Sequence, residues 1–147
     1  MSTRYREVDV AGSPLEMGRQ LGEEAREEVR AFATIALERV NKTIAISRQS
    51  ALDVARQSAA CVEDYAPHML DELRGMAQSS GVDFDDLVLL QVRNQLQPEE
   101  DAGCTSFAAA SSIVAQNWDN DPALDPYTIV LRRRPDNGPA LMNITQI

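Results

Sequence analysis

The sequence predicts an α+β fold, in which a helical segment is followed by short antiparallel strands. Up to about residue 97 the apolar residues recur at steps of three and four, as on one face of an α-helix. From Cys104 onward they alternate with polar residues, which is typical of strands. A polar stretch, 98–103, separates the two patterns. We therefore divide the chain into a helical segment, 1–103, and a strand segment, 104–147.

Composition excludes several classes of protein. The net charge is -9, and residues 1–103 hold 19 acidic against 11 basic side chains. Such a surplus repels phosphate backbones, so nucleic acid is excluded as a partner. No apolar run approaches the roughly 20 residues that a membrane helix needs, so we expect no membrane partner and a cytoplasmic location. Two cysteines and one histidine are too few for a structural zinc site, and no cofactor or metal is predicted.

The first predicted elements are a strand and a long helix. Residues 5–10 alternate as a short strand does, and the helix then begins at Ser13, an N-cap residue followed by proline. Glu16 completes a capping box with Ser13. The apolar periodicity continues to Ile44, so we expect one amphipathic helix over 13–44. We interpret the acidic residues among 23–28 as its solvated face rather than a metal site.

Three further helices are predicted before the polar stretch. Apolar periodicity favours one from about Ser50 to Tyr65 and a second from Pro67 to about Ser79, with Gly81 as its C-cap. Asp83 is expected to cap the last helix, which we expect to end near Pro98.

Two residues outside the strand segment invite a chemical role. Cys61 lies within an apolar helical pattern, so we expect a small buried side chain and an inert thiol. His68 falls on the first turn of a helix, where a surface or capping role is favoured over catalysis. A disulfide or redox site built from Cys61 and Cys104 has no spacing to support it.

The strand segment alternates in four places. Strands are predicted over 105–109, 113–115, 127–131 and 140–147, and residues 135–138 form a strong hairpin turn. The arginines at 132–134 are expected to end the third strand.

The start of the strand segment could support thiol chemistry. If the bond between Gly103 and Cys104 were cut, the new α-amino group, with a pKa near 8, could accept the thiol proton at neutral pH. Cys104 would then be nucleophile and base in one residue. Glycine at the preceding position permits the strained backbone that an attack on its own carbonyl requires. A cysteine at the start of a strand is more often structural, so both interpretations stay open at this point.

Several segments together resemble one enzyme family. The resemblance is carried by Gly103-Cys104-Thr105-Ser106-Phe107 and Gln116-Asn117-Trp118-Asp119, with upstream support from Gly12-Ser13-Pro14, Gly18-Arg19-Gln20-Leu21-Gly22, Tyr65-Ala66-Pro67-His68 and Glu72-Leu73-Arg74-Gly75. The family is that of acyl-coenzyme A:6-aminopenicillanate acyltransferase, also called peptidase family C45. It belongs to the N-terminal nucleophile hydrolases. The match extends over nearly the whole chain.

This resemblance implies a self-cleaving hydrolase or acyltransferase. Cleavage between Gly103 and Cys104 would leave an α-chain, 1–103, associated with a β-chain that begins at Cys104. Cys104 would be the thiol nucleophile, Asp119 would hold the new ammonium group, and Asn117 would support it. Gln116 stands where related bile-salt and penicillin V hydrolases carry arginine, which favours the acyltransferase branch. The expected substrate is a small-molecule amide or thioester that carries an acyl group.

The resemblance also sets an expectation about length. Family members fold as an αββα sandwich of two sheets between helical layers, and their β-chains are much longer than the 44 residues that follow Gly103. The sequence therefore predicts only the first strands of the sandwich, with a missing portion beyond Ile147. The alternative function is that of a truncated, inactive fragment that acts as a helical interaction module.

Overall fold

The structure, a computed structural model, describes residues 4–41, 44–96, 104–109, 113–119 and 121–147. It confirms the α+β class. The helices are α1 (Pro14–Glu24), α2 (Arg26–Val40), α3 (Arg48–Tyr65), α4 (Pro67–Ser80) and α5 (Phe84–Val92), with 3-10 turns η1 (Arg93–Leu96) and η2 (Pro122–Tyr127). The strands are β1 (Arg6–Gly12), β2 (Ser106–Ala109), β3 (Ile113–Gln116), β4 (Thr128–Pro135) and β5 (Leu141–Gln146).

The strands form two separate sheets. In the larger sheet the order is β1-β4-β5, with β4 parallel to β1 and antiparallel to β5. The predicted turn at 135–138 joins β4 to β5, and β2 and β3 form a separate antiparallel hairpin. The sequence predicts these strands but not the pairing of β1 with β4. That parallel pairing requires a crossover, which the intervening helices provide. As a result, β1 of the predicted helical segment shares a sheet with β4 and β5 of the predicted strand segment.

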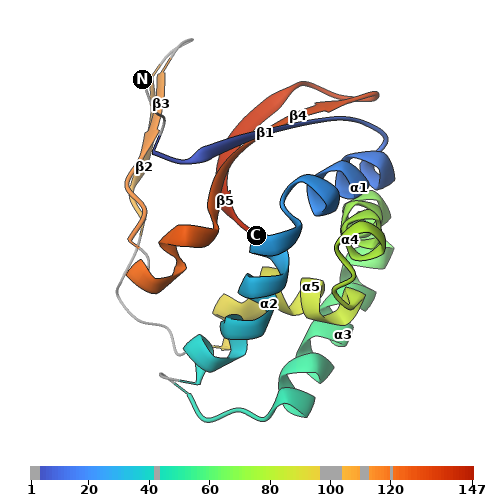
Figure 1. Ribbon diagram of the computed structural model, residues 1–147, viewed down its shortest axis with the longest axis vertical. Helices are drawn as coiled ribbons and strands as arrows, with labels where there is room; N and C mark the ends of the chain where they lie inside the picture. Colours follow the sequence, from blue (N-terminus) through green and yellow to red (C-terminus); the bar gives the residue numbers. More distant parts are fainter. Residues whose placement is uncertain (1–3, 42–43, 97–103, 110–112, 120) are drawn as a thin grey trace.

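The core lies between this sheet and the helices (Figure 1). Val8 and Val10 of β1 and Ile129 and Leu131 of β4 are buried, and they share one apolar cluster with α1, α2, α4 and α5. Because side chains alternate along a strand, the neighbouring β4 residues point to the opposite face. There Arg132 pairs with Glu7 and Asp9 of β1. The helical segment and the strand segment therefore fold around one core.

The predicted helix over 13–44 is wrong in its continuity, because it is two helices. The capping box at Ser13 and Glu16 forms as expected, but α1 ends at Glu24 and its C-cap, Ala25, has φ -111° and ψ 31°. Arg6 of β1 donates to the Glu24 carbonyl and pairs with the carboxylates of Glu24 and Glu28. This tertiary contact occupies the Glu24 carbonyl, where the helix breaks. The apolar periodicity of the sequence cannot reveal such a contact.

Helices α1 and α4 approach each other through glycines. A Cβ atom on Gly18 would lie 1.9 Å from the Glu72 carbonyl oxygen, and one on Gly75 would lie 2.1 Å from that of Leu15. Both distances are far below van der Waals contact, so only glycine fits at these two crossing points. Gly18 and Gly75, both quoted above for the family resemblance, therefore have a packing role.

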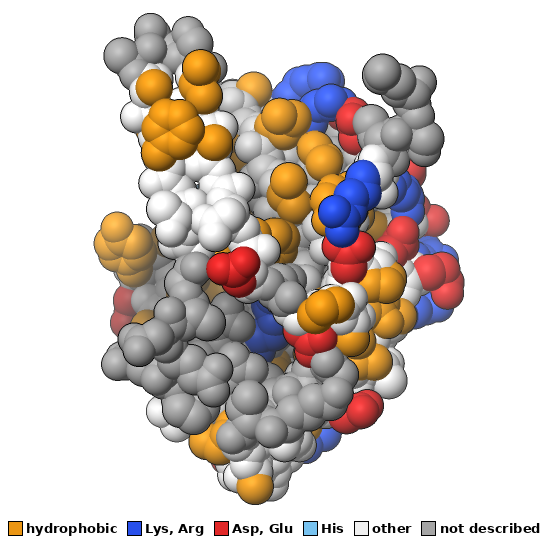
Figure 2. Space-filling view, turned by 90° about the vertical axis from the view of Figure 1, so that its left-hand side faces the viewer, with side chains coloured by type: hydrophobic (Ala, Val, Ile, Leu, Met, Phe, Trp, Pro, Cys, Tyr) orange, Lys and Arg blue, Asp and Glu red, His pale blue; other side chains and the backbone are white. Residues whose placement is uncertain are grey.

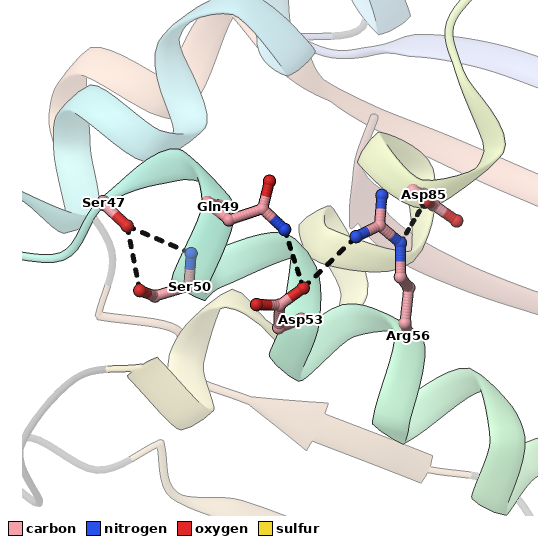
Figure 3. A network of polar contacts seen from close by, with 6 residues as sticks. All are labelled: Ser47, Gln49, Ser50, Asp53, Arg56 and Asp85. Carbon is pink, nitrogen blue, oxygen red and sulfur yellow. Dashed lines mark hydrogen bonds and ion pairs between the residues drawn. The ribbon is translucent and has the colours of Figure 1, made fainter.

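Ion pairs join α3 to α5. Arg56 bonds Asp85 through Nε at 2.7 Å and Asp53 through Nη1 at 3.2 Å (Figure 3). Ser47 caps α3, and its side chain accepts the Ser50 amide, so α3 begins slightly before the predicted Ser50. These groups are exposed or half-exposed, so they orient the helices more than they stabilise them.

Helix α5 carries four consecutive buried residues, 87–90, because it lies between two apolar clusters. Leu87 and Leu90 face the main cluster, while Val88 and Leu89 face a smaller one with α3. Asp83 occupies the predicted N-cap position, but its side chain accepts no capping hydrogen bond, which corrects that expectation. The αL cap of α4 at Gly81, with φ 76°, is confirmed.

The prediction for Cys61 is wrong, because its side chain is exposed. The buried residues of α3 are Ala51 and Ala55. Cys61 is rotated about two-thirds of a turn around the helix axis from Ala55, so it lies on another face of the helix. His68 is exposed, as expected for a surface residue.

Candidate functional site

The residues singled out for catalysis lie on and beside the β2–β3 hairpin. Ser106 pairs with Gln116 and Ala109 with Ile113. The pairing continues one residue further, because the Asn117 amide donates to the Thr105 carbonyl at 3.0 Å. In return, the Thr105 amide donates to the Asn117 side-chain oxygen at 2.7 Å. Asn117 therefore holds the residue that follows Cys104 by two hydrogen bonds.

This contact gives the predicted supporting residue a specific geometry. The sequence predicts that Asn117 supports Asp119, whereas the described hydrogen bonds connect it to the neighbour of Cys104. A side-chain amide oxygen here replaces the backbone carbonyl that would accept the next ladder bond. Asparagine is suited to this position because its short side chain can hydrogen-bond nearby backbone. Gln116 takes part through its backbone as the partner of Ser106.

Cys104 directly precedes the paired region in sequence, and Asp119 lies two residues after it. Both side chains are exposed, and between these two described residues there is no hydrogen bond. Gly103, the other half of the predicted cleavage site, lies outside the described residues. The hairpin thus places both candidates at one end of the same two-stranded unit without bringing their side chains into contact.

The hairpin stands apart from the helices (Figure 1). Every described residue of β2 and β3 is exposed, and Phe107, Ile113 and Val114 among them are apolar. Figure 2 looks at the side of the molecule on which the hairpin lies and shows hydrophobic side chains at its surface. No burial or desolvation of the thiol is therefore provided by the described neighbours.

A mostly apolar cavity lies elsewhere, between α4 and the end of the sheet. Its volume is about 750 Å³, and its walls are mostly apolar, including Met17, Leu73, Met76 and Leu141. His68 contributes to its lining, but no residue of the hairpin does. Large apolar cavities are common ligand sites, but this one cannot serve Cys104 directly in the present arrangement.

A half-buried ion pair lies in the wall of this cavity. Arg133 of β4 bonds Glu72 of α4 at 2.8 Å and 3.0 Å, and also bonds the Asn143 side chain at 2.7 Å. Sequence reasoning placed this arginine only at the end of a strand and gave no sign of its partners. Its guanidinium is held on one side by a carboxylate and on the other by an amide. The pair therefore connects α4 to the β4–β5 half of the sheet.

Arg93, at the start of η1, is a second residue to which sequence reasoning assigned no role. It donates to the Leu90 carbonyl and to the Gln146 side-chain oxygen, and its guanidinium lies 5.0 Å from the Phe32 ring centroid. Burial lowers the pKa of Arg93 from its usual value. Each of these partners is neutral, so no carboxylate among the described residues balances the charge. Only its tertiary contacts identify Arg93 as a residue of interest.

Among the described helices, none is long and apolar enough to cross a membrane. No protein-family model matches the chain, and a search of curated proteins finds no sequence that matches it significantly.

Proposed function

We propose that this chain is the precursor of an N-terminal-cysteine hydrolase or acyltransferase, which cleaves itself between Gly103 and Cys104. The observation that carries the proposal is the pair of hydrogen bonds between Asn117 and Thr105. They bring the described parts of the two segments of the resemblance, Cys104 to Phe107 and Gln116 to Asp119, together at one hairpin. The two segments lie on consecutive strands, and their direct pairing at the hairpin supports the proposal.

The larger sheet supports the same proposal. Helices cover one of its faces. The other face carries Met142 and Ile144, which are exposed and apolar, beside Val130. An apolar half-face of this kind suits packing against a second sheet, as in the αββα sandwich that the proposal implies. In that arrangement the exposed hairpin would also be covered.

Self-cleavage would proceed through a thioester. The Cys104 thiolate attacks the Gly103 carbonyl carbon, the C–N bond breaks, and the Cys104 nitrogen takes a proton to become an amine. Water then attacks the thioester, which leaves a carboxylate on Gly103 and returns the thiol of Cys104. The products are two chains and a free α-amino group beside the nucleophile.

The mature reaction uses that amino group as the base. It accepts the thiol proton, and Cys104 attacks the substrate carbonyl to form an acyl thioester as the leaving group departs with a proton. Water or an amine then takes the acyl group. Asp119, two residues after Asn117, is proposed to hold the ammonium form of the amino group by charge. A small-molecule acyl amide or thioester and a cytoplasmic location stay part of the proposal.

The test is the intact mass of the purified chain. We expect two species divided between Gly103 and Cys104 in the wild type, and a single uncut species in Cys104→Ala. The matched control is Cys61→Ala, which removes the other exposed thiol and should be cut like the wild type. A wild-type chain that stays whole, or a Cys104→Ala chain that is still cut, would contradict the proposal.

A second candidate is a protein-interaction module. It is favoured by the exposed apolar residues of the hairpin and by β5, whose outer edge has no strand partner among the described residues. Because β1 and β4 share one sheet and core, this module would be the whole body rather than the helices alone. An uncut wild-type chain that self-associates in sedimentation, with association lost in Val114→Glu, would favour this candidate.

A further inference from the structure

The contacts of Arg93 converge on the two points where the hairpin region joins the body. Arg93 begins η1, directly after α5 and before residues 97–103. Its Nη2 donates to the Gln146 side-chain oxygen at 2.7 Å, and its guanidinium lies over the ring of Phe32 from α2. Arg93 therefore joins α2, η1 and β5.

Gln146 connects Arg93 to η2, which follows the hairpin in sequence. Its side-chain nitrogen donates to the Leu124 carbonyl in η2 at 3.4 Å, and only 6% of the Gln146 residue is exposed. Leu124 is buried, and Tyr127 at the end of η2 stacks on Phe32 with ring centroids 5.6 Å apart. The Ile147 amide donates to the Tyr127 carbonyl at 3.0 Å. Gln146 thus stands between Arg93 and η2, with both ends of its amide used.

η1 precedes the region that carries the candidate chemistry, and η2 follows it. Cys104, Asn117 and Asp119 all lie between these two turns in sequence, on a hairpin whose described residues are exposed. The position of the hairpin on the body therefore depends on how its two flanks are attached. The contacts through Arg93 and Gln146 provide one attachment that spans both flanks.

We propose that Arg93 and Gln146 form a clamp that positions the self-cleavage region by tying η1 to η2. Neither residue touches the reacting atoms, so both are positioning residues. This role deepens the proposed function and rests on it. A glutamine is required for the clamp, because one end must accept from a guanidinium and the other must donate to a carbonyl.

The variant Gln146→Glu separates positioning from stability. A carboxylate keeps the acceptor and gives the partly buried Arg93 a counter-charge, so the free energy of unfolding should stay equal or rise. It has no donor for the Leu124 carbonyl, so the hydrogen bond from residue 146 to η2 is lost. We expect hydrogen exchange of residues 121–128 to rise at least tenfold in a Cys104→Ala background, where the chain stays whole. In the presence of Cys104, self-cleavage should slow at least tenfold.

The matched control is Gln91→Glu, which makes the same change at an exposed position of α5. It should alter neither the exchange nor the rate of cleavage. Gln146→Leu removes both contacts and should slow cleavage while lowering stability. A purely structural role predicts that cleavage follows stability in all of these variants.

The outcomes distinguish this inference from the proposed function. Unchanged exchange of 121–128 in Gln146→Glu, or a rise spread over the whole chain, would overturn the clamp. Local loosening with an unchanged cleavage rate would overturn the positioning role. A wild-type chain that is never cut would remove the proposed function and the role in cleavage with it, whereas the exchange measurement would still decide the clamp.

Discussion

The body of the molecule and the hairpin are packed in opposite ways. In the body, α1 and α4 approach until backbone touches backbone at Gly18 and Gly75, and Leu131 and Ala25 are fully buried. On the hairpin, every described side chain of β2 and β3 is exposed. The residues proposed for chemistry thus lie on the least packed part, where local opening is expected to cost least. In the proposed function, the closely packed body would be the platform, and the attachment of the hairpin would determine how Cys104 is held.

The largest expected difference comes from truncating matched apolar residues in the two regions. Leu131→Ala empties a site that is 0% exposed and should reduce the free energy of unfolding by about 2–5 kcal/mol. Ile113→Ala, at a hairpin position that is 56% exposed, should change it by less than about 0.5 kcal/mol. Urea unfolding of both variants measures the two values. A similar loss in both would mean that the hairpin is packed against something in solution.

A smaller effect tests the glycine crossing of α1 and α4. Glycine to alanine inside a helix ordinarily stabilises it by up to about 1 kcal/mol. Gly75→Ala should instead destabilise by about 1–3 kcal/mol, because the new Cβ would meet the Leu15 carbonyl oxygen at 2.1 Å. Gln57→Ala, at an exposed position of α3, is the control and should be close to neutral. Urea unfolding decides the sign, and a Gly75→Ala chain as stable as the wild type would exclude the close crossing.

The smallest expected effect concerns the contact of Asp125 in η2 with Arg4 and Tyr5, which precede β1. Asp125 in η2 accepts from the Tyr5 hydroxyl at 2.8 Å and from Arg4, and these bonds lower the pKa of its carboxyl. A lowered pKa means that the contact stabilises the fold above the unfolded pKa, near 4, and is lost as the pH falls through the folded value. An NMR titration should find Asp125 ionising below its usual range. In Tyr5→Phe that pKa should rise toward normal, and an unchanged value would exclude the contact.

Local rules predict much of the fold. The capping box at Ser13, the αL cap at Gly81, and the strands after Cys104 follow from residue type and spacing, and the structure confirms them. The predictions that fail have a common cause. The break after Glu24 and the exposure of Cys61 depend on contacts between elements distant in sequence. The apolar periodicity of one helix does not show which other helix or strand packs against it.

For the candidate site, too, the sequence predicts some features and leaves others to the tertiary structure. The sequence identifies Cys104, Asp119, Asn117 and Gln116 through their types and their resemblance to a family, and their catalytic roles stay predictions. It does not identify the hydrogen bond that the Thr105 amide donates to the Asn117 side chain, nor Arg93 and Gln146 as partners. These last two residues are more than fifty positions apart and match no local pattern.

The sequence by itself determined which segments become helices and strands, because capping, periodicity and turn chemistry act within a few residues. It also determined which residues could carry a thiol reaction. The tertiary structure decided that β1 joins β4, that α1 and α4 meet through glycine, and that Arg93 reaches η2 through Gln146. Such arrangements depend on which distant surfaces fit together when the core forms. That fit is a property of the whole packed chain, so it becomes visible only when the chain is folded.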